Sequence, residues 1–266
     1  MMPRVLAVAN QKGGVGKTTT AVNLAAIWAA EGMRVLLVDV DPQGNATEGV
    51  GVRPGDPERS LADVLAGECG VAEAVVPTRF PNLDLVPGDL TLAGLEADMA
   101  LAGDGRGPGV TLLREVLAPV VERYDVTVLD CPPSLGWLTM NALVAAERVL
   151  VPVRPGQFSM SGLQQLFGTV QNVRYRALNA RLRVVGIFFN ECNTHSNLYK
   201  AVRQAVTKIY SRSVIDIAVP ATTRVGESQM LGEPICAYDR GSRAHAAFAA
   251  LAEEVMRRWQ GVSREG

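Results

Sequence analysis

A glycine-rich turn near the N-terminus constrains the fold of this chain more than any other feature. The apolar run Val5–Ala9 has the character of a buried strand, and it leads into Gln-Lys-Gly-Gly-Val-Gly-Lys-Thr at residues 11–18. A helical pattern begins at Lys17. Glycines let backbone N–H groups curl around phosphate oxygens, and the N-terminus of the following helix adds free donors and partial positive charge. The turn therefore predicts a phosphate-binding loop between a strand and a helix.

The side chains of this loop have separate expected roles. Lys17 would reach the β- and γ-phosphates of a nucleotide, and the Thr18 hydroxyl would bind Mg²⁺. The usual template has a glycine five positions before Gly16, where this chain has Gln11, and a second lysine, Lys12, precedes the double glycine. A glycine-rich turn without a ligand is the alternative. By average composition, the string Lys-Gly-Gly-x-Gly-Lys-Ser/Thr would occur by chance in roughly one chain in ten thousand or fewer.

Two apolar segments further along the chain each end in an aspartate. Residues 35–38 lead into Asp39 and Asp41, and residues 126–129 lead into Asp130. Ligands of open α/β sheets bind outside the carboxyl ends of the strands, so these acids are expected to face the phosphate loop. Asp130 fits the acid that supports Mg²⁺, and Asp41 fits a group that orients the attacking water. For Asp39, direct contact and support of its neighbours are both open, and a strand-end cap is the alternative for each acid.

Short β-branched runs alternate with longer helical patterns along the chain, which indicates a parallel sheet covered by helices. The expected strands are Arg4–Ala9, Arg34–Val38, Leu83–Val86, Val126–Leu129, Val149–Val153, Val184–Phe189 and Val214–Ala218. The expected helices are Lys17–Glu31, Leu61–Ala66, Leu90–Ala100, Thr111–Arg123, Ser159–Ala177, Asn197–Tyr210 and Ser242–Trp259. The loose stretches 49–59 and 103–109 are expected to be surface loops. The predicted fold class is α/β: a doubly wound, mostly parallel sheet with helices on both faces, formed by residues 1–266 as a single domain.

Cysteine spacing and hydropathy exclude several other classes of protein. Cys69, Cys131, Cys192 and Cys236 are widely spaced, which argues against a zinc site, an iron–sulfur carrier and a disulfide framework. We expect buried thiols in a reducing cytosol. The N-terminal apolar run is too short for a signal peptide, and no stretch approaches about 18 uncharged apolar residues. A cytoplasmic protein is therefore predicted.

Charge is unevenly distributed along the chain. The formal net charge is −1, from 26 Lys and Arg against 27 Asp and Glu, which by itself argues against a nucleic-acid binder. Residues 1–170, however, hold 12 basic and 19 acidic side chains, whereas residues 171–266 hold 14 and 8. Residues 171–213 alone contain eight basic side chains and the single acid Glu191. This split favours a basic face for an anionic partner, with chance imbalance on a solvated surface as the alternative.

The motifs resemble those of one known family. Residues 12–18 look like the deviant Walker A motif of the ParA/MinD ATPases. The stretches 39–45, 124–134 and 138–146 are similar to the ParA/Soj branch, which serves chromosome and plasmid partition, and so is the C-terminal part beginning at Gly232. The resemblance covers nearly the whole chain and is strongest before residue 153. The length resembles the short form of the family without an added N-terminal DNA-binding domain.

This resemblance implies an ATP-dependent sandwich dimer. Lys12 would cross the dimer interface to the phosphates of the partner chain, where a second cation can act like an arginine finger. Lys12, Lys17 and Asp41 would form the catalytic set. Gly13 and Gly14 would lie where the two nucleotide sites meet, so that a side chain there should block closure.

The resemblance also implies the cofactors ATP and Mg²⁺. The residues implied in nucleotide binding are Gly13, Gly14, Val15, Gly16, Lys17, Thr18, Thr19, Asn190 and Pro220, the last two beside the adenine. Those implied in magnesium binding are Thr18, Asp41 and Asp130.

Partition ATPases bind DNA without sequence preference, and residues 197–210 form the candidate helix for that contact. At about 100° per residue, one face holds the apolar residues Leu198, Val202, Ala205, Val206 and Ile209, and the other holds Lys200, Arg203, Gln204, Thr207 and Lys208. An ordinary amphipathic surface helix is the alternative. The expected DNA contacts are Lys200, Arg203, Lys208, Arg224 and Arg243. Phosphate contacts of this kind are non-specific and sensitive to salt.

The resemblance, together with these features, implies a DNA partition ATPase that acts as a slow switch. ATP and Mg²⁺ would join two chains, the dimer would hold double-stranded DNA at the nucleoid, and a ParB-like centromere-binding protein would stimulate hydrolysis and release. The alternatives are a related ATPase that positions a protein cargo over the nucleoid and a MinD-like membrane-associated ATPase. No stable membrane binding is expected, because the tail 260–266 is polar and the apolar stripe Phe248, Leu251, Ala252, Val255 and Trp259 should pack on the sheet.

The chain departs from the family pattern in two places. Gly156 and Ser161 stand where the family usually has glutamates. In residues 219–228, only one of two usual arginines is present, as Arg224. These differences leave the nucleotide chemistry intact and leave open the stimulating partner, the replicon served and the cargo.

Overall fold

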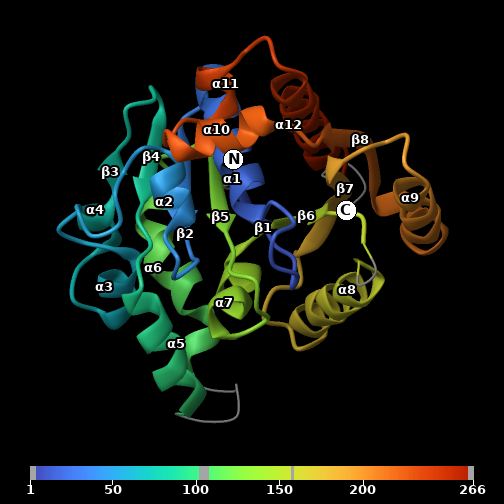
Figure 1. The fold of residues 1–266 in the computed structure, drawn as a ribbon. Coiled ribbons are helices and arrows are strands. Elements are labelled where there is room, and N and C mark those ends of the chain that lie inside the picture. Colours follow the sequence, from blue (N-terminus) through green and yellow to red (C-terminus); the bar gives the residue numbers. More distant parts are fainter. Residues whose placement is uncertain (1–3, 102–107, 157–158, 263–266) are drawn as a thin grey trace.

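One eight-stranded sheet runs through the computed structural model, which describes residues 4–101, 108–156 and 159–262 (Figure 1). Along the sheet the strands stand in the order β3-β4-β2-β5-β1-β6-β7-β8. Their bounds are β1 Val5–Val8, β2 Val35–Asp39, β3 Val76–Pro77, β4 Leu83–Val86, β5 Val126–Asp130, β6 Arg148–Val153, β7 Arg183–Cys192 and β8 Val214–Pro220. Neighbouring strands are parallel, except that β3 is antiparallel to β4. The predicted doubly wound, mostly parallel fold is therefore confirmed.

Helices cover both faces of this sheet. One face carries α1 Lys17–Ala30, α2 Asn45–Gly49, α10 Thr223–Met230, α11 Ile235–Tyr238 and α12 Arg243–Val262. The other carries α3 Leu61–Ala66, α4 Val71–Ala74, α5 Thr91–Leu101, α6 Leu112–Val121, α7 Trp137–Ala145, α8 Ser159–Tyr175 and α9 Asn197–Tyr210. Two short 3-10 turns, η1 Pro108–Thr111 and η2 Ser211–Ser213, precede α6 and β8. The core consequently has two layers, one on each side of the sheet.

The central strands are mostly apolar because helices bury both of their faces. All four residues of β1 are buried, and so are all six of β6. On the α1 face, the buried Trp28 donates its indole N–H to the carbonyl of Ala252 in α12 at 3.4 Å. The stripe from Phe248 to Trp259 is buried in this layer, as predicted. The apolar side of α12 therefore forms part of the hydrophobic core.

The strand order places one crevice at the centre of the molecule. After β1 the chain fills the β2–β4 side of the sheet, then returns through β5 and continues to β6, β7 and β8 on the other side. Ligands of open α/β sheets bind at the carboxyl ends of the strands where the winding reverses. In Figure 1 the loop between β1 and α1 lies at this point.

All seven predicted strands and all seven predicted helices are present, with bounds that differ by up to three residues. The prediction missed β3, α2, α4 and α11, which have two to five residues and show no periodicity. It also missed α7 and α10, because α7 is almost wholly apolar and α10 is mostly polar, so neither has the expected stripe. The loop predicted at 49–59 is a loop beyond the end of α2, whereas most of 103–109 lies outside the described residues.

Cys131, Cys192 and Cys236 are buried, as predicted. The prediction is wrong for Cys69, which is partly exposed because it lies in the short connection between α3 and α4. No helix in the described parts of the chain is long and apolar enough to cross a bilayer.

Candidate nucleotide site

The loop that follows β1 leads into a helix start whose backbone N–H groups are available to a ligand. Gly14 and Gly16 have φ angles of +68° and +84°, in the left-handed region that favours glycine. Helix α1 begins at Lys17 without a side-chain cap, and the N–H of Thr20 donates to the carbonyl of Gly16 at 3.0 Å. The N–H groups of residues 17–19 have no partner within the helix, so they are available to phosphate oxygens.

Asn190, at the carboxyl end of β7, supports this loop from the neighbouring side of the sheet. Its amide nitrogen donates to the carbonyl of Val15 at 3.0 Å. A Cβ added at Gly16 would collide with the same amide. The amide oxygen of Asn190 is buried and has no hydrogen-bond partner in the described structure. Asn190 therefore holds the loop with one end of its amide and leaves an acceptor free at the other.

The sheet brings two of the predicted aspartates together. Asp39 ends β2 directly beside Asp130, the last residue of β5. The Asp39 carboxylate accepts hydrogen bonds of 2.8 Å from the N–H and the hydroxyl of Thr47, and one of 3.2 Å from the N–H of Asp41. Burial raises the pKa of Asp39 to about 6. These contacts favour the supporting role for Asp39, because both of its oxygens hold neighbouring backbone in place.

Asp130 has a very different environment. It is fully buried, and neither carboxylate oxygen has a hydrogen-bond partner among the described residues. Burial and then repulsion from Asp39 raise the pKa of Asp130 well above its usual range, while the nearby Thr18 hydroxyl opposes the rise without a well-formed hydrogen bond. The Lys17 ammonium experiences the opposite balance: burial lowers its pKa, and the charge of Asp130 counteracts that shift. A buried carboxylate without partners is costly, which indicates a site made for a cation or its water ligands.

This donor set fits Mg²⁺ held jointly with a phosphate. Within the described ranges, no three His, Cys, Asp or Glu side chains are grouped closely enough to hold a metal by themselves. Mg²⁺ usually takes one or two protein ligands and completes its shell with phosphate oxygens and water. The Thr18 hydroxyl would be the direct ligand, and the free oxygens of Asp130 suit hydrogen bonds from metal-bound water. Asp41 lines the same cavity as Thr18.

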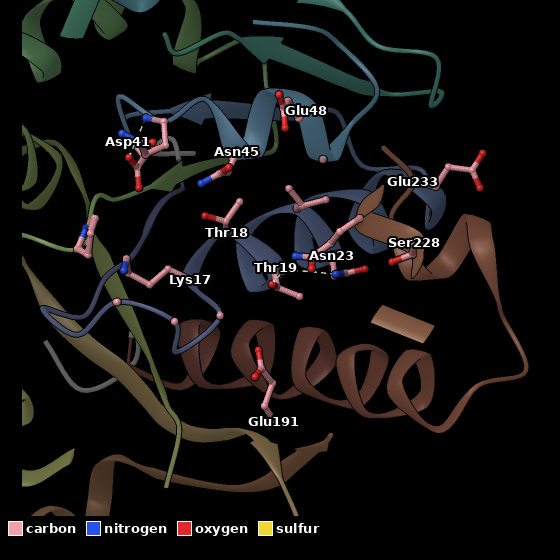
Figure 2. A pocket seen from close by; sticks show the side chains of 18 residues that line it. Lys17, Thr18, Thr19, Asn23, Asp41, Asn45, Glu48, Glu191, Ser228 and Glu233 are labelled. Carbon is pink, nitrogen blue, oxygen red and sulfur yellow. Dashed lines mark hydrogen bonds between the residues drawn. The ribbon is translucent and has the colours of Figure 1, made fainter. Parts of the chain in front are cut away.

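Two adjoining cavities surround the start of α1. The first, of about 430 Å³, is lined by the predicted residues Gly13, Gly14, Gly16, Lys17, Thr18, Thr19 and Asp41 (Figure 2). The second, of about 510 Å³, is lined by Asn190 and Pro220 together with residues of α10. Both cavities are lined by Thr19, Glu191 and Gln229. The structure thus brings the phosphate loop, Asp41 and the two predicted adenine neighbours to one continuous site.

Several polar residues of this site were missed by the sequence reasoning. Those lining the first cavity include Asn23, Gln43, Asn45, Glu48, Glu191, Ser228, Gln229 and Glu233. Gln229 of α10 donates its amide N–H to the Thr19 hydroxyl at 2.7 Å, and Asn23 accepts from the N–H of Ile235 at 2.7 Å. The C-terminal helices are therefore bonded to the first two turns of α1. Nothing in the sequence pattern of α10 indicated this contact.

Neither Lys12 nor Val15 is among the residues that line the two cavities, although the Lys17 ammonium donates to the carbonyl of Lys12 at 3.4 Å. Val15 is buried, so it can offer only its backbone to a ligand. The backbone N–H of Lys12 donates to the Asn10 side chain at 3.1 Å. A Cβ added at Gly156 would lie 3.2 Å from the Lys12 ammonium nitrogen. In a single chain, Lys12 therefore rests against Gly156 and does not line the cavity of its own phosphate loop.

The basic residues predicted on α9 differ in how free their charges are. Lys200 and Lys208 are exposed, and neither has an ion-pair partner in the described ranges. Arg203 is half-buried and pairs with Asp216 at 2.6 Å. Lys200, Arg203 and Lys208 line a shallow surface hollow together with the polar side chains of Gln204 and Thr207. Of the three charges, those of the two lysines are the more available to a partner.

The predicted apolar face of α9 is partly wrong. Val202 and Val206 pack inward as predicted, but Tyr199 is buried with them, while Leu198 and Ile209 are 55% and 57% exposed. The apolar residues of this helix span an arc wider than the sheet can cover. The edge of the apolar face that contains Tyr199 packs into the core, and the edge that contains Leu198 and Ile209 stays exposed to solvent.

Arg224 and Arg243 lie away from α9. Arg224 lies on α10 and pairs with Glu227 at 3.1 Å and with Asp239 at 3.5 Å. Arg243 is exposed at the start of α12. Figure 1 shows α10 and the start of α12 well separated from α9. The structure therefore does not unite the five predicted DNA contacts on one surface of a single chain.

Fold and site together define the class of this protein. A parallel sheet, a glycine-rich loop after β1, a lysine and a threonine at the start of α1, and a buried aspartate at the end of β5 are the parts of a P-loop nucleotide-binding protein. A family model described as an AAA domain matches residues 3–184. The chain belongs to the ParA/Soj family of chromosome-partitioning ATPases.

Three known proteins illustrate the relationship. The sporulation initiation inhibitor protein Soj of Bacillus subtilis is 40% identical over 259 residues, which cover 96% of this chain and 98% of that protein. The chromosome-partitioning ATPase Soj of Thermus thermophilus is 42% identical over 257 residues, or 97% of both chains. A cobyrinic acid a,c-diamide synthase from Mycobacterium smegmatis, solved with ADP and magnesium, is 34% identical with a TM-score of 0.82, covering 97% of this chain and 96% of that one.

Proposed function

We propose that this chain is an ATP-dependent DNA partition ATPase, a single domain formed by residues 1–266. ATP and Mg²⁺ join two chains, the dimer holds double-stranded DNA without sequence preference, and hydrolysis stimulated by a ParB-like centromere-binding protein releases it. The observation that carries the proposal is the pair of adjoining cavities, one at the phosphate loop and one at Asn190 and Pro220, which together suit a nucleoside triphosphate. The protein would act in the cytoplasm, at the nucleoid.

The residues of the site divide the work of hydrolysis. Lys17 and the backbone of the loop would hold the β- and γ-phosphates, while Thr18 and Asp130 would hold Mg²⁺, which would neutralise charge on the phosphates. Asp41 accepts a hydrogen bond from the N–H of Gln43 at 3.0 Å with one carboxylate oxygen, and its other oxygen would orient an attacking water. Lys12 of the second chain supplies the remaining positive charge.

Base recognition would come from the second cavity. The amide oxygen of Asn190 suits the exocyclic amino group of adenine, because it is an acceptor without a partner among the described residues. Pro220 and Val225 line the same cavity and offer apolar surface to a purine ring. This arrangement supports ATP as the ligand.

Gly16→Ala is expected to weaken ATP binding by the single chain about 100-fold, and Gly14→Ala by less than about tenfold. Both substitutions place a Cβ at a positive φ, which costs about 1–2 kcal/mol. Only at Gly16 would the new atom also displace the Asn190 amide from the loop, whereas at Gly14 no described residue apart from its chain neighbours lies within 4 Å of the same position. Titration with a fluorescent ATP analogue at low protein concentration measures both. Equal losses in the two variants would contradict the supporting role of Asn190.

The DNA-binding part of the proposal is supported by α9. Its 14 residues include three basic and no acidic side chains, and Lys200 and Lys208 are exposed at its surface. A dimer would present this helix twice, and phosphate contacts alone are enough for non-specific binding. Arg203 is a weaker candidate because Asp216 already neutralises it.

ATP-dependent retention on DNA is expected to fall at least tenfold at moderate salt in a Lys200→Glu, Lys208→Glu double variant. Each reversed lysine removes a phosphate contact and adds repulsion, so the dependence of log affinity on log salt should become shallower by about two per chain. Retention on immobilised DNA, with and without ATP, measures this effect. The matched control reverses two exposed arginines elsewhere, Arg53 and Arg123, and should bind like the wild type. Unchanged retention in the double variant would show that α9 is the wrong surface.

A further inference from the structure

Glu191 occupies a distinctive position between the two cavities of the site. It is one of the three residues that line both of them, and Figure 2 shows its side chain rising from β7 toward the phosphate loop. A Cβ added at Gly16 would lie 3.7 Å from one of its carboxylate oxygens. The acid therefore lies against the edge of the phosphate loop, on the side of the base cavity.

The backbone at Glu191 is held in an unusual conformation. Its φ is +49°, one of three positive values among the described residues other than glycine. The pairing of β7 with β8 is irregular between Phe189 and Cys192, the stretch that contains Glu191. Positive φ is unfavourable for a residue with a Cβ, and such strain tends to persist where a side chain must be aimed at a functional site.

Arg154, directly after β6, compensates the charge of this acid. Its guanidinium pairs with the carboxylate of Glu191 at 3.3 Å, and the two side chains are 54% and 36% exposed. The Arg154 charge offsets the repulsion that an unpaired carboxylate would exert on a triphosphate. The partial exposure of Glu191 leaves it accessible to a ligand.

We infer that Glu191 is the ribose-recognition residue of this site, accepting a hydrogen bond from a sugar hydroxyl of the bound nucleotide. The inference rests on the proposed nucleotide function and deepens it. A nucleotide with its phosphates in the first cavity and its base in the second must pass its sugar between them, where Glu191 lies. An ionised carboxylate only accepts hydrogen bonds, and ribose hydroxyls are the donors that this part of a nucleotide offers. Glu191 therefore gives the site a preference for ribonucleotides.

The test compares dissociation constants for ATP, 2′-deoxy-ATP and 3′-deoxy-ATP in the full chain with Mg²⁺. The wild type is expected to bind ATP about tenfold more tightly than at least one deoxy analogue, as for a hydrogen bond to a charged acceptor. In Glu191→Ala this ratio should fall below about twofold while the affinity for ATP itself stays within about threefold of the wild type. Glu191→Gln, which keeps an acceptor without its charge, should give an intermediate ratio.

The control is Glu48→Ala, which removes another exposed acid of the first cavity from the α2 side of α1 and should keep the wild-type ratio. Equal affinities for all three nucleotides in the wild type would overturn the inference, and so would an undiminished ratio in Glu191→Ala. An equal loss of affinity for every nucleotide in that variant would show a purely structural role. If the wild type binds none of them, the proposed nucleotide function fails as well, so the two failures are distinguishable.

Discussion

An Asp41→Ala variant is expected to hydrolyse ATP at least about 100-fold more slowly than the wild type while it still binds ATP and remains on DNA. Asp41 is only 5% exposed, and together with Lys17 it lines the cavity at the phosphate loop. Its removal takes away the group that orients the attacking water but leaves the phosphate contacts of the loop intact. Loss of a negative charge beside a triphosphate should also preserve or strengthen ATP binding. The dimer is therefore expected to accumulate in its DNA-bound form.

Phosphate release and retention on DNA, measured on the same preparation, test this expectation. Asp41→Asn keeps the shape and can still accept a hydrogen bond from the N–H of Gln43, but its neutral amide oxygen is a weaker acceptor for an attacking water than a carboxylate, so it should also be slower than the wild type. Glu48→Ala, again an acid of the same cavity, should turn over at the wild-type rate within about twofold. Normal turnover in Asp41→Ala would remove Asp41 from the catalytic set.

The frame of the site could be predicted from the sequence because its parts follow from local rules. A glycine-rich turn between an apolar run and a helix marks the loop, and an aspartate at the end of an apolar run marks Asp130. Both depend on neighbours within a few residues. Parallel strands then carry their carboxyl ends to one edge of the sheet whatever their order, so the acids had to meet the loop.

The contacts that complete the site could not be predicted in the same way. Asn190 bonds to Val15 across 175 positions of the chain, and Gln229 bonds to Thr19 across 210. No spacing rule connects residues so far apart. The prediction of the buried face of α9 was partly wrong for a related reason. The helix has more apolar residues than the sheet can cover, and only the packing of Tyr199 decides which edge of the apolar face is buried.

A Lys12→Ala variant is expected to bind ATP as a single chain within about threefold of the wild type but to lose about 1000-fold in hydrolysis. ATP binding should be nearly unchanged because the Lys12 side chain does not line either cavity of its own chain and rests against Gly156. The glycine at position 156 is important here, because a Cβ at that position would lie 3.2 Å from the Lys12 ammonium nitrogen, and no ion pair holds this ammonium among the described residues. The loss of hydrolysis follows if Lys12 completes the charge of the partner's site, as an arginine finger does when supplied by a second molecule.

Mixing two inactive variants separates action within one chain from action across the dimer. A mixed dimer of Lys12→Ala and Asp41→Ala chains contains one site with its own Asp41 and, from the partner, an intact Lys12.

If Lys12 acts across the interface, that site is complete, and an equal mixture should recover about a quarter of wild-type turnover, since about half of the dimers are mixed and each has one working site. If Lys12 acts within its own chain, every site in the mixture lacks either the lysine or the aspartate, and the mixture stays as inactive as its components. Recovery of turnover requires both chains to bind ATP, which the position of Lys12 outside both cavities and the retained phosphate contacts of Asp41→Ala allow. The mixture therefore decides whether the lysine that rests on Gly156 in one chain belongs to the active site of the other.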